Sequence, residues 1–167
     1  MNRIILIVVF AMALVGCASN ISVEPMKNLG FSVYSPEYIP EGFTVNTQLD
    51  SDKQGVLVTY AKEKEYIEII QKLGSTYMYT NLVRNYFNKL ANKSIEKEDP
   101  MFEYLEIGDF AGEVNTSLQA QNIFNYVFVP KEILQETVDI KSIPYYEIQS
   151  NIDRDEVLKL IKSLKKD

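Results

Sequence analysis

The sequence contains no histidine and no tryptophan, and it has a single cysteine. Without histidine the chain lacks the usual general base near neutral pH and the commonest metal ligand. Zinc sites and Ser-His or Cys-His nucleophile pairs are therefore excluded, and one cysteine cannot form an intramolecular disulfide. We identify no catalytic residue, no metal ligand and no cofactor site, which favours a binding protein over an enzyme.

Positive charge is also scarce. The chain has 17 Lys and Arg against 23 Asp and Glu, a net charge of −6. An acidic domain repels phosphate backbones, so we expect no nucleic-acid partner. It also gains nothing from anionic lipid headgroups, so attachment to a membrane requires a separate anchor.

The sequence has no long hydrophobic run. Ile4 to Val15 is apolar throughout, but a membrane-spanning helix needs about 20 apolar residues, more than this run supplies. Arg3 precedes the run and small residues follow it. This arrangement is typical of a secretory signal peptide, which we assign to residues 1–16.

The run ends in Leu14-Val15-Gly16-Cys17, which resembles the bacterial lipobox. The resemblance implies cleavage between Gly16 and Cys17 and lipidation of the Cys17 thiol. One acyl chain holds a protein to a membrane only marginally, whereas two on one residue give a stable anchor. We therefore expect residues 17–29 to form a lipidated tether and the protein to sit on the extracytoplasmic face of the cell membrane.

Residues 30–167 have the length and composition of one globular domain. Apolar alternation predicts strands joined by short polar turns, and a period of three to four residues predicts two helices. The predicted helices cover about 81–92 and 154–165. The predicted strands cover 31–34, 43–49, 56–60, 66–71, 101–107, 112–118, 122–129 and 145–149. We predict an α+β fold, with a curved antiparallel sheet of about six to eight strands and both helices packed on one face.

The last helix has the clearest signature. Asp153 is placed to cap its start, and Glu156 follows three residues later as in a capping box. Four apolar residues recur at helical spacing and predict the buried stripe. They are Val157, Leu160, Ile161 and Leu164.

Three stretches carry a family resemblance: residues 34–43, residues 67–71, and residues 146–150 followed by 156–164. The most specific piece is the proline-bracketed turn from Pro36 to Phe43. Together they resemble a domain of unknown function found in exported parts of Gram-positive sporulation lipoproteins and membrane-bound anti-sigma factors. The resemblance spans roughly residues 31–164. It implies an extracytoplasmic, sheet-rich, non-catalytic domain and provides no catalytic residue.

Exposed tyrosines are the candidate binding residues. Tyr38 and Ile39 lie in a turn that two prolines stiffen, so they could bind a partner at little entropic cost. Tyr77 and Tyr79 precede the first predicted helix and could contact cell-wall sugars or a protein. The alternative for all four is ordinary packing, with Tyr38 and Ile39 plugging the end of the sheet.

An acidic run could bind a hard cation, but lysines interrupt it and it lacks a calcium-loop motif, so we expect a solvated loop. Its members are Glu96, Glu98, Asp99, Glu103 and Glu106.

The sequence leaves three functions open. We favour a lipid-anchored, non-catalytic binding or signalling module that meets a protein partner at the membrane or cell wall. A lipid or lipoprotein carrier would instead require an acyl-binding cavity between sheet and helices. A cell-wall-acting enzyme would require a cleft with two converging carboxylates.

Overall fold

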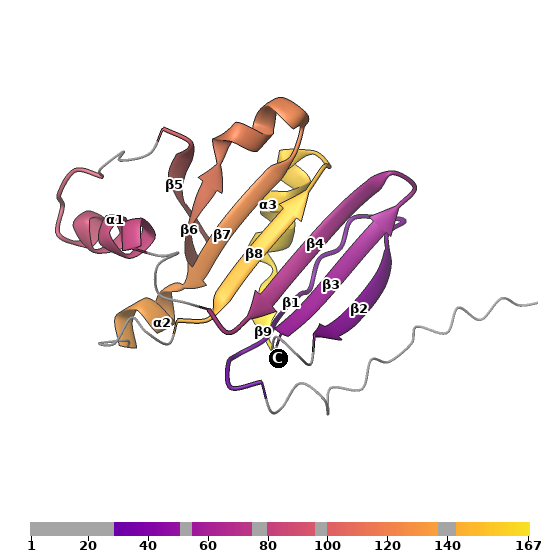
Figure 1. The fold of residues 1–167 in the computed structure, drawn as a ribbon, viewed down its shortest axis with the longest axis horizontal. Coiled ribbons are helices and arrows are strands. Elements are labelled where there is room, and N and C mark those ends of the chain that lie inside the picture. The colour runs from indigo at the N-terminus through magenta and orange to yellow at the C-terminus, as the bar shows by residue number, and fades with distance from the viewer. Residues whose placement is uncertain (1–28, 51–54, 75–79, 96–99, 137–142) are drawn as a thin grey trace, which may run out of the picture.

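The computed structural model describes residues 29–50, 55–74, 80–95, 100–136 and 143–167 (Figure 1). Gly16 and Cys17, the predicted signal peptide and most of the tether lie outside the described residues, as do Tyr77 and Tyr79. Among the described helices, none combines the length and the hydropathy that a membrane span needs.

The elements of the described residues follow a simple order, with strands predominating. They are β1 (Tyr34–Pro36), β2 (Thr44–Asp50), β3 (Gly55–Lys62), β4 (Glu65–Lys72), α1 (Thr80–Leu90), β5 (Phe102–Ile107), β6 (Phe110–Asn115), the 3-10 helix η3 (Thr116–Gln121), β7 (Phe124–Pro130), α2 (Lys131–Glu136), β8 (Tyr145–Ser150), α3 (Arg154–Lys162) and β9 (Leu164–Lys166).

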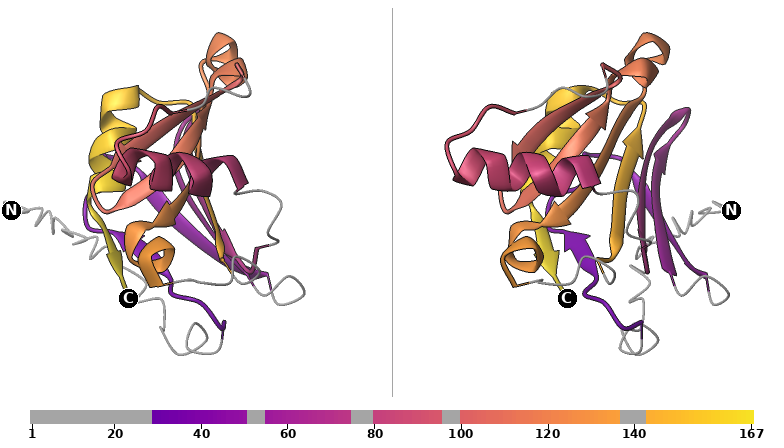
Figure 2. Two further views of the ribbon diagram at one scale, coloured as in Figure 1. Left: turned by 90° about the vertical axis from the view of Figure 1, so that its left-hand side faces the viewer. Right: turned by 60° about the vertical axis from the view of Figure 1, so that its left-hand side comes forward.

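Seven strands form one open antiparallel sheet in the order β2-β3-β4-β8-β7-β6-β5. Strand β8 joins two meanders, because it pairs with β4 on one side and with β7 on the other. A second sheet contains only β1 and β9 and connects the two ends of the domain. The predicted α+β class and the predicted number of strands are confirmed, and Figure 2 shows the twist of the large sheet.

The main core lies between the large sheet and α3. Strands β7 and β8 alternate, so that Tyr126 and Phe128 point toward α3 together with Tyr146 and Ile148. The burial predicted for the last helix's stripe is confirmed, because all four residues belong to this core, although Leu164 follows α3 rather than lying in it. Three of them, Val157, Leu160 and Ile161, are completely buried.

Helix α1 packs on the opposite face of the sheet, so the prediction of both helices on one face is wrong (Figure 2). Its buried residues Leu82 and Tyr86 share a second core with Ala111, Val129 and Tyr145. Val129 and Tyr145 each follow or precede a residue of the main core, so strand alternation points them the other way. A helical period shows that α1 has a buried side but does not show which sheet face covers it.

Several predicted boundaries also change. Helix α3 ends at Lys162, because Leu164 begins β9 and pairs with Pro36. The strand expected over 112–118 becomes β6 followed by η3, since the Asn115 side chain accepts from the Ser117 amide at 3.1 Å and caps the 3-10 turn. The first strand, expected over 31–34, is β1 at Tyr34–Pro36, and it pairs with β9, which is distant in sequence.

One buried amide connects the two sheets. Gln71 in β4 is only 1 % exposed. Its Oε1 accepts from the backbone N–H of Tyr34 at 2.7 Å, and its Nε2 donates to the Tyr34 carbonyl at 2.9 Å. The side chain therefore satisfies both polar backbone groups of Tyr34 and holds β1 against the large sheet.

Candidate binding cleft

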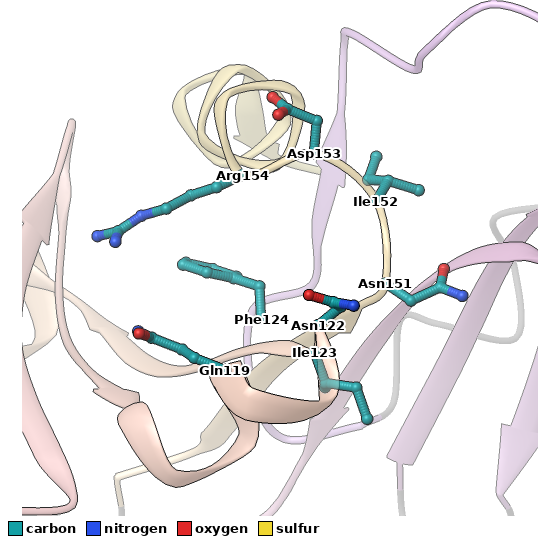
Figure 3. A pocket seen from close by; sticks show the side chains of 8 residues that line it. All are labelled: Gln119, Asn122, Ile123, Phe124, Asn151, Ile152, Asp153 and Arg154. Atoms are coloured by element: carbon teal, nitrogen blue, oxygen red, sulfur yellow. The ribbon is translucent and has the colours of Figure 1, made fainter.

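A cleft of about 400 Å³ opens at one end of the sheet (Figure 3). Its lining comes from two segments, the η3–β7 turn within residues 119–124 and the β8–α3 connection at 151–154. These segments are distant in sequence but meet because Phe124 pairs with Ser150 across β7 and β8. The volume is within the range of small-ligand sites.

Local hydrogen bonds hold both walls of the cleft. The Asn151 side chain accepts from the Tyr66 amide at 2.8 Å and donates to the Lys64 carbonyl at 2.8 Å, which fixes the β8–α3 connection to the β3–β4 hairpin. The Asp153 carboxylate accepts from the Asp155 amide at 2.9 Å and caps α3, as predicted. Asn122 adopts a left-handed conformation, with φ of 57°, and ends η3. The walls are therefore built before any ligand binds.

Arg154 is the cationic group at the cleft, beside the Asp153 carboxylate that caps α3. Its guanidinium carbon lies 5.7 Å from the centroid of the Phe124 ring, a cation–π distance. Figure 3 shows the ring between Arg154 and Gln119, whose side chains extend the same way. Within the described part of the chain no carboxylate forms an ion pair with Arg154. A guanidinium placed in this way can bind a carboxylate or phosphate in bidentate fashion.

The remaining side chains that line the cleft include both polar and apolar ones. Within the residues that the structure describes, no hydrogen bond engages the side-chain amides of Gln119 and Asn122. Ile123 and Ile152 add apolar surface beside Phe124. This set of groups suits an extended peptide segment, because amides pair with peptide groups and the arginine pairs with an acidic side chain.

Tyr38 lies away from this cleft and against α3. Its hydroxyl donates to the Glu156 carboxylate, and its backbone N–H donates to Ser163 Oγ at 2.9 Å. The hydrogen bond with Glu156 raises the pKa of Tyr38. Tyr38 also packs against the main core, as the plugging interpretation expects, whereas Ile39 is 40 % exposed.

Glu156 does not act as the capping-box residue that the sequence suggested. Its carboxylate instead contacts Lys159 Nζ at 2.6 Å and the Tyr38 hydroxyl. These two hydrogen bonds lower the pKa of Glu156, with the bond from Lys159 contributing most. Asp153 thus caps α3 alone, and Glu156 fastens the Pro36–Phe43 turn to the helix.

A second cavity, of about 430 Å³, lies between α2 and β9 and includes two carboxylates, Asp109 and Glu132. Glu132 is already engaged, because it accepts from the Tyr34 hydroxyl at 2.9 Å and pairs with Lys166 at 3.5 Å. Among the described residues, no group of three or more acidic side chains or cysteines could hold a metal ion.

The space beneath α3 is filled with side chains. Leu160 and Ile161 pack there with Tyr126 and Phe128, and all four are completely buried. Of the predicted acidic run, Glu103 and Glu106 lie within the described residues, whereas Glu96, Glu98 and Asp99 do not. Glu106 is an ion-pair partner of Lys89 and Lys131, at 2.8 Å from each.

The sequence did not point to the cleft residues. Arg154 falls in the predicted last helix but outside its buried stripe, and Phe124 is one of several residues in a β-prone run. Only the pairing of β7 with β8 brings the two together. Gln119 lies in η3, between two predicted strands, and Asn122 ends η3 at the position where the sequence pattern predicted the start of a strand.

The fold and the cleft define an α+β protein with a ligand-sized, mixed polar and apolar cleft. A family described as a domain of unknown function, DUF4367, matches residues 33–164, and the chain belongs to this family. This confirms the resemblance to a domain of unknown function over nearly the expected range. No curated protein and no solved structure matches the chain.

Proposed function

We propose that the protein is a lipid-anchored binding module, held on the extracytoplasmic face of the membrane, that receives an acidic segment of a partner protein in the cleft. The observation that carries this proposal is Arg154. In a chain with a net charge of −6, its guanidinium lies over Phe124 with no carboxylate partner in the described residues. A carboxylate of a partner could form this ion pair with the guanidinium.

Binding is favoured over the other two functions by particular features. A carrier needs an apolar cavity, yet the space between the sheet and α3 is filled by buried side chains such as Leu160 and Phe128. An enzyme of the carboxylate type needs two acids at one cleft. The cleft has one, Asp153, and this carboxylate caps α3.

The anchor is tested on the full chain. Cys17→Ser removes the thiol that would carry the acyl chains, so we expect loss of lipid labelling and an unprocessed or released protein. Mass spectrometry of the membrane-extracted wild type should show acylated Cys17 as its first residue. An unmodified Cys17, or a mature protein that starts elsewhere, would contradict the anchor but would leave the cleft proposal intact.

The cleft is tested by photo-crosslinking in cells. A photoreactive amino acid at Ala120, an exposed residue beside Gln119, places the probe at the rim of the cleft. We expect a discrete crosslinked protein whose contacting segment contains Asp or Glu. Arg154 is exposed in the free chain, and a bound partner would cover it. Loss of one charge pair covered in this way costs about 2–5 kcal/mol and 1.4 kcal/mol is a factor of ten, so Arg154→Glu should reduce this product at least tenfold.

The matched control is Lys162→Glu, an equal charge reversal on an exposed residue at the other end of the same helix. This variant should keep the crosslink. Equal loss in both variants would show a general charge effect and would contradict the assignment to the cleft. Turnover of a wall, lipid or peptide substrate by the purified protein would overturn the non-catalytic function.

A further inference from the structure

The two edge strands of the large sheet differ in how well they are protected from pairing with another chain. Strand β5 is one edge, and it carries Glu103 and Glu106. Lys89 of α1 reaches Glu106 at 2.8 Å, so charge and a neighbouring helix guard this edge. Natural proteins use such devices to prevent pairing with other chains.

Strand β2 is the other edge, at the margin of the sheet in Figure 1. In the described residues it pairs only with β3, along all seven of its residues. Thr44 to Leu49 contains no charged residue and no proline, and Val45 is 46 % exposed. The outward-facing backbone N–H and C=O groups of β2 are therefore accessible for pairing with another strand.

The sequence of this edge is chemically palindromic. Residues 45–49 read Val-Asn-Thr-Gln-Leu, that is, apolar, amide, threonine, amide, apolar in either direction. If two copies pair in antiparallel orientation with Thr47 opposite Thr47, Val45 lies opposite position 49 and Asn46 lies opposite Gln48. Each position thus meets a residue of its own chemical class.

The same register keeps the two faces of the sheet separate. Val45 and Thr47 lie opposite Tyr60 and Val58 of β3, which point into the main core. Asn46 belongs to the other face, opposite Thr59. Any two residues that pair about Thr47 are separated by an even number of positions along β2. Because side chains alternate between the two faces of a strand, each core-face residue then pairs with a core-face residue of the other copy.

We propose that two copies of the chain associate through their β2 strands, antiparallel and with Thr47 on the two-fold axis, to form one continuous sheet. A two-fold axis requires a self-complementary surface, and the palindrome provides one. Asp50, the one charged residue of β2, would lie opposite Thr44 in this register, so two acidic chains can approach without like charges facing each other across the strands. The proposal depends neither on the lipid anchor nor on the cleft, which lies between the η3–β7 turn and the β8–α3 connection.

The register is tested by oxidation of cysteine variants in the full chain. Opposed Cα atoms of an antiparallel pair are about 4.5–5.5 Å apart, within the span that a disulfide accepts. Thr47→Cys should therefore form a covalent dimer of twice the monomer mass on a non-reducing gel. Val45→Cys is the control on the same strand, because the two copies of residue 45 would be four positions apart, about 13 Å. The wild type, in which Cys17 is the single cysteine, shows how much covalent dimer forms through that residue.

A dimer with Thr47→Cys that exceeds both controls supports the proposal. Equal crosslinking of Thr47→Cys and Val45→Cys, or of Thr47→Cys and the wild type, overturns it. A second measurement needs no oxidation: Thr47→Lys places two cations on the axis, so sedimentation velocity should show loss of the dimer. Ser117→Lys, at an exposed residue of η3, should sediment as the wild type does. A wild type that is monomeric at every concentration tested also overturns the proposal.

Discussion

At the scale of single residues, Glu106 joins three elements. It lies in β5 and pairs with Lys89 of α1 and Lys131 of α2, and it accepts from the Tyr104 hydroxyl at 2.8 Å. Burial opposes its ionisation, but the hydrogen bonds from these three residues outweigh burial and lower the pKa of Glu106 to about 2. The carboxylate therefore stabilises the fold only while it is ionised.

Glu106→Gln should lower stability in a pH-dependent way. Because the folded pKa lies below the ordinary value of 4.5, the stabilisation is fully present above about pH 5 and is lost as the pH falls toward 2. At pH 7 the variant should lose about 1–3 kcal/mol of unfolding free energy, and the difference from wild type should shrink in acid. Urea denaturation across this range measures it. Glu103→Gln, at an exposed residue of the same strand, should not show this pH-dependent loss of stability. A stability difference between Glu106→Gln and the wild type that stays constant with pH would contradict the prediction.

At the scale of elements, the sequence was most informative for α3. Both its cap at Asp153 and its buried stripe could be predicted, because a cap and a helical period are local signals. The face that α1 covers could not be predicted, since that depends on strand order. Strand β9 could not be predicted either, because three residues acquire a strand conformation only through pairing with β1. The cleft depends on the same long-range pairing and was missed for the same reason.

The buried stripe of α3 gives a prediction at this scale. Leu160 is completely buried among the aromatic side chains of β7 and β8. Leu160→Ala should lower the free energy of unfolding by about 2–5 kcal/mol, the usual cost of a buried leucine and the cavity it leaves. Lys162→Ala, on the exposed side of the same helix, should change it by less than about 0.5 kcal/mol. Coincident denaturation midpoints for Leu160→Ala and the wild type would show that the stripe does not support the fold.

At the scale of the whole molecule, the small sheet joins the first described strand to the last. Besides the ladder of β1 and β9, the Asp167 amide donates to the Val33 carbonyl at 3.0 Å, and Ser35 Oγ contacts the Asp167 carboxylate at 2.9 Å. Gln71 then ties this ladder to the large sheet through Tyr34. The C-terminal residues thus close the domain beside the segment that leads to the predicted tether.

Closing this ladder covalently should stabilise the entire domain. Ser35 and Lys165 lie directly opposite each other in the β1–β9 register, so Ser35→Cys with Lys165→Cys places two thiols at disulfide distance. The crosslink would enclose nearly the whole folded chain, and such long loops gain about 2–4 kcal/mol in practice. Urea denaturation of the oxidised double variant, compared with the same protein under reductant and with Ser35→Cys alone, measures the gain. If oxidation leaves the midpoint unchanged, the ends of the domain separate without unfolding it, and the small sheet does not belong to the cooperative unit.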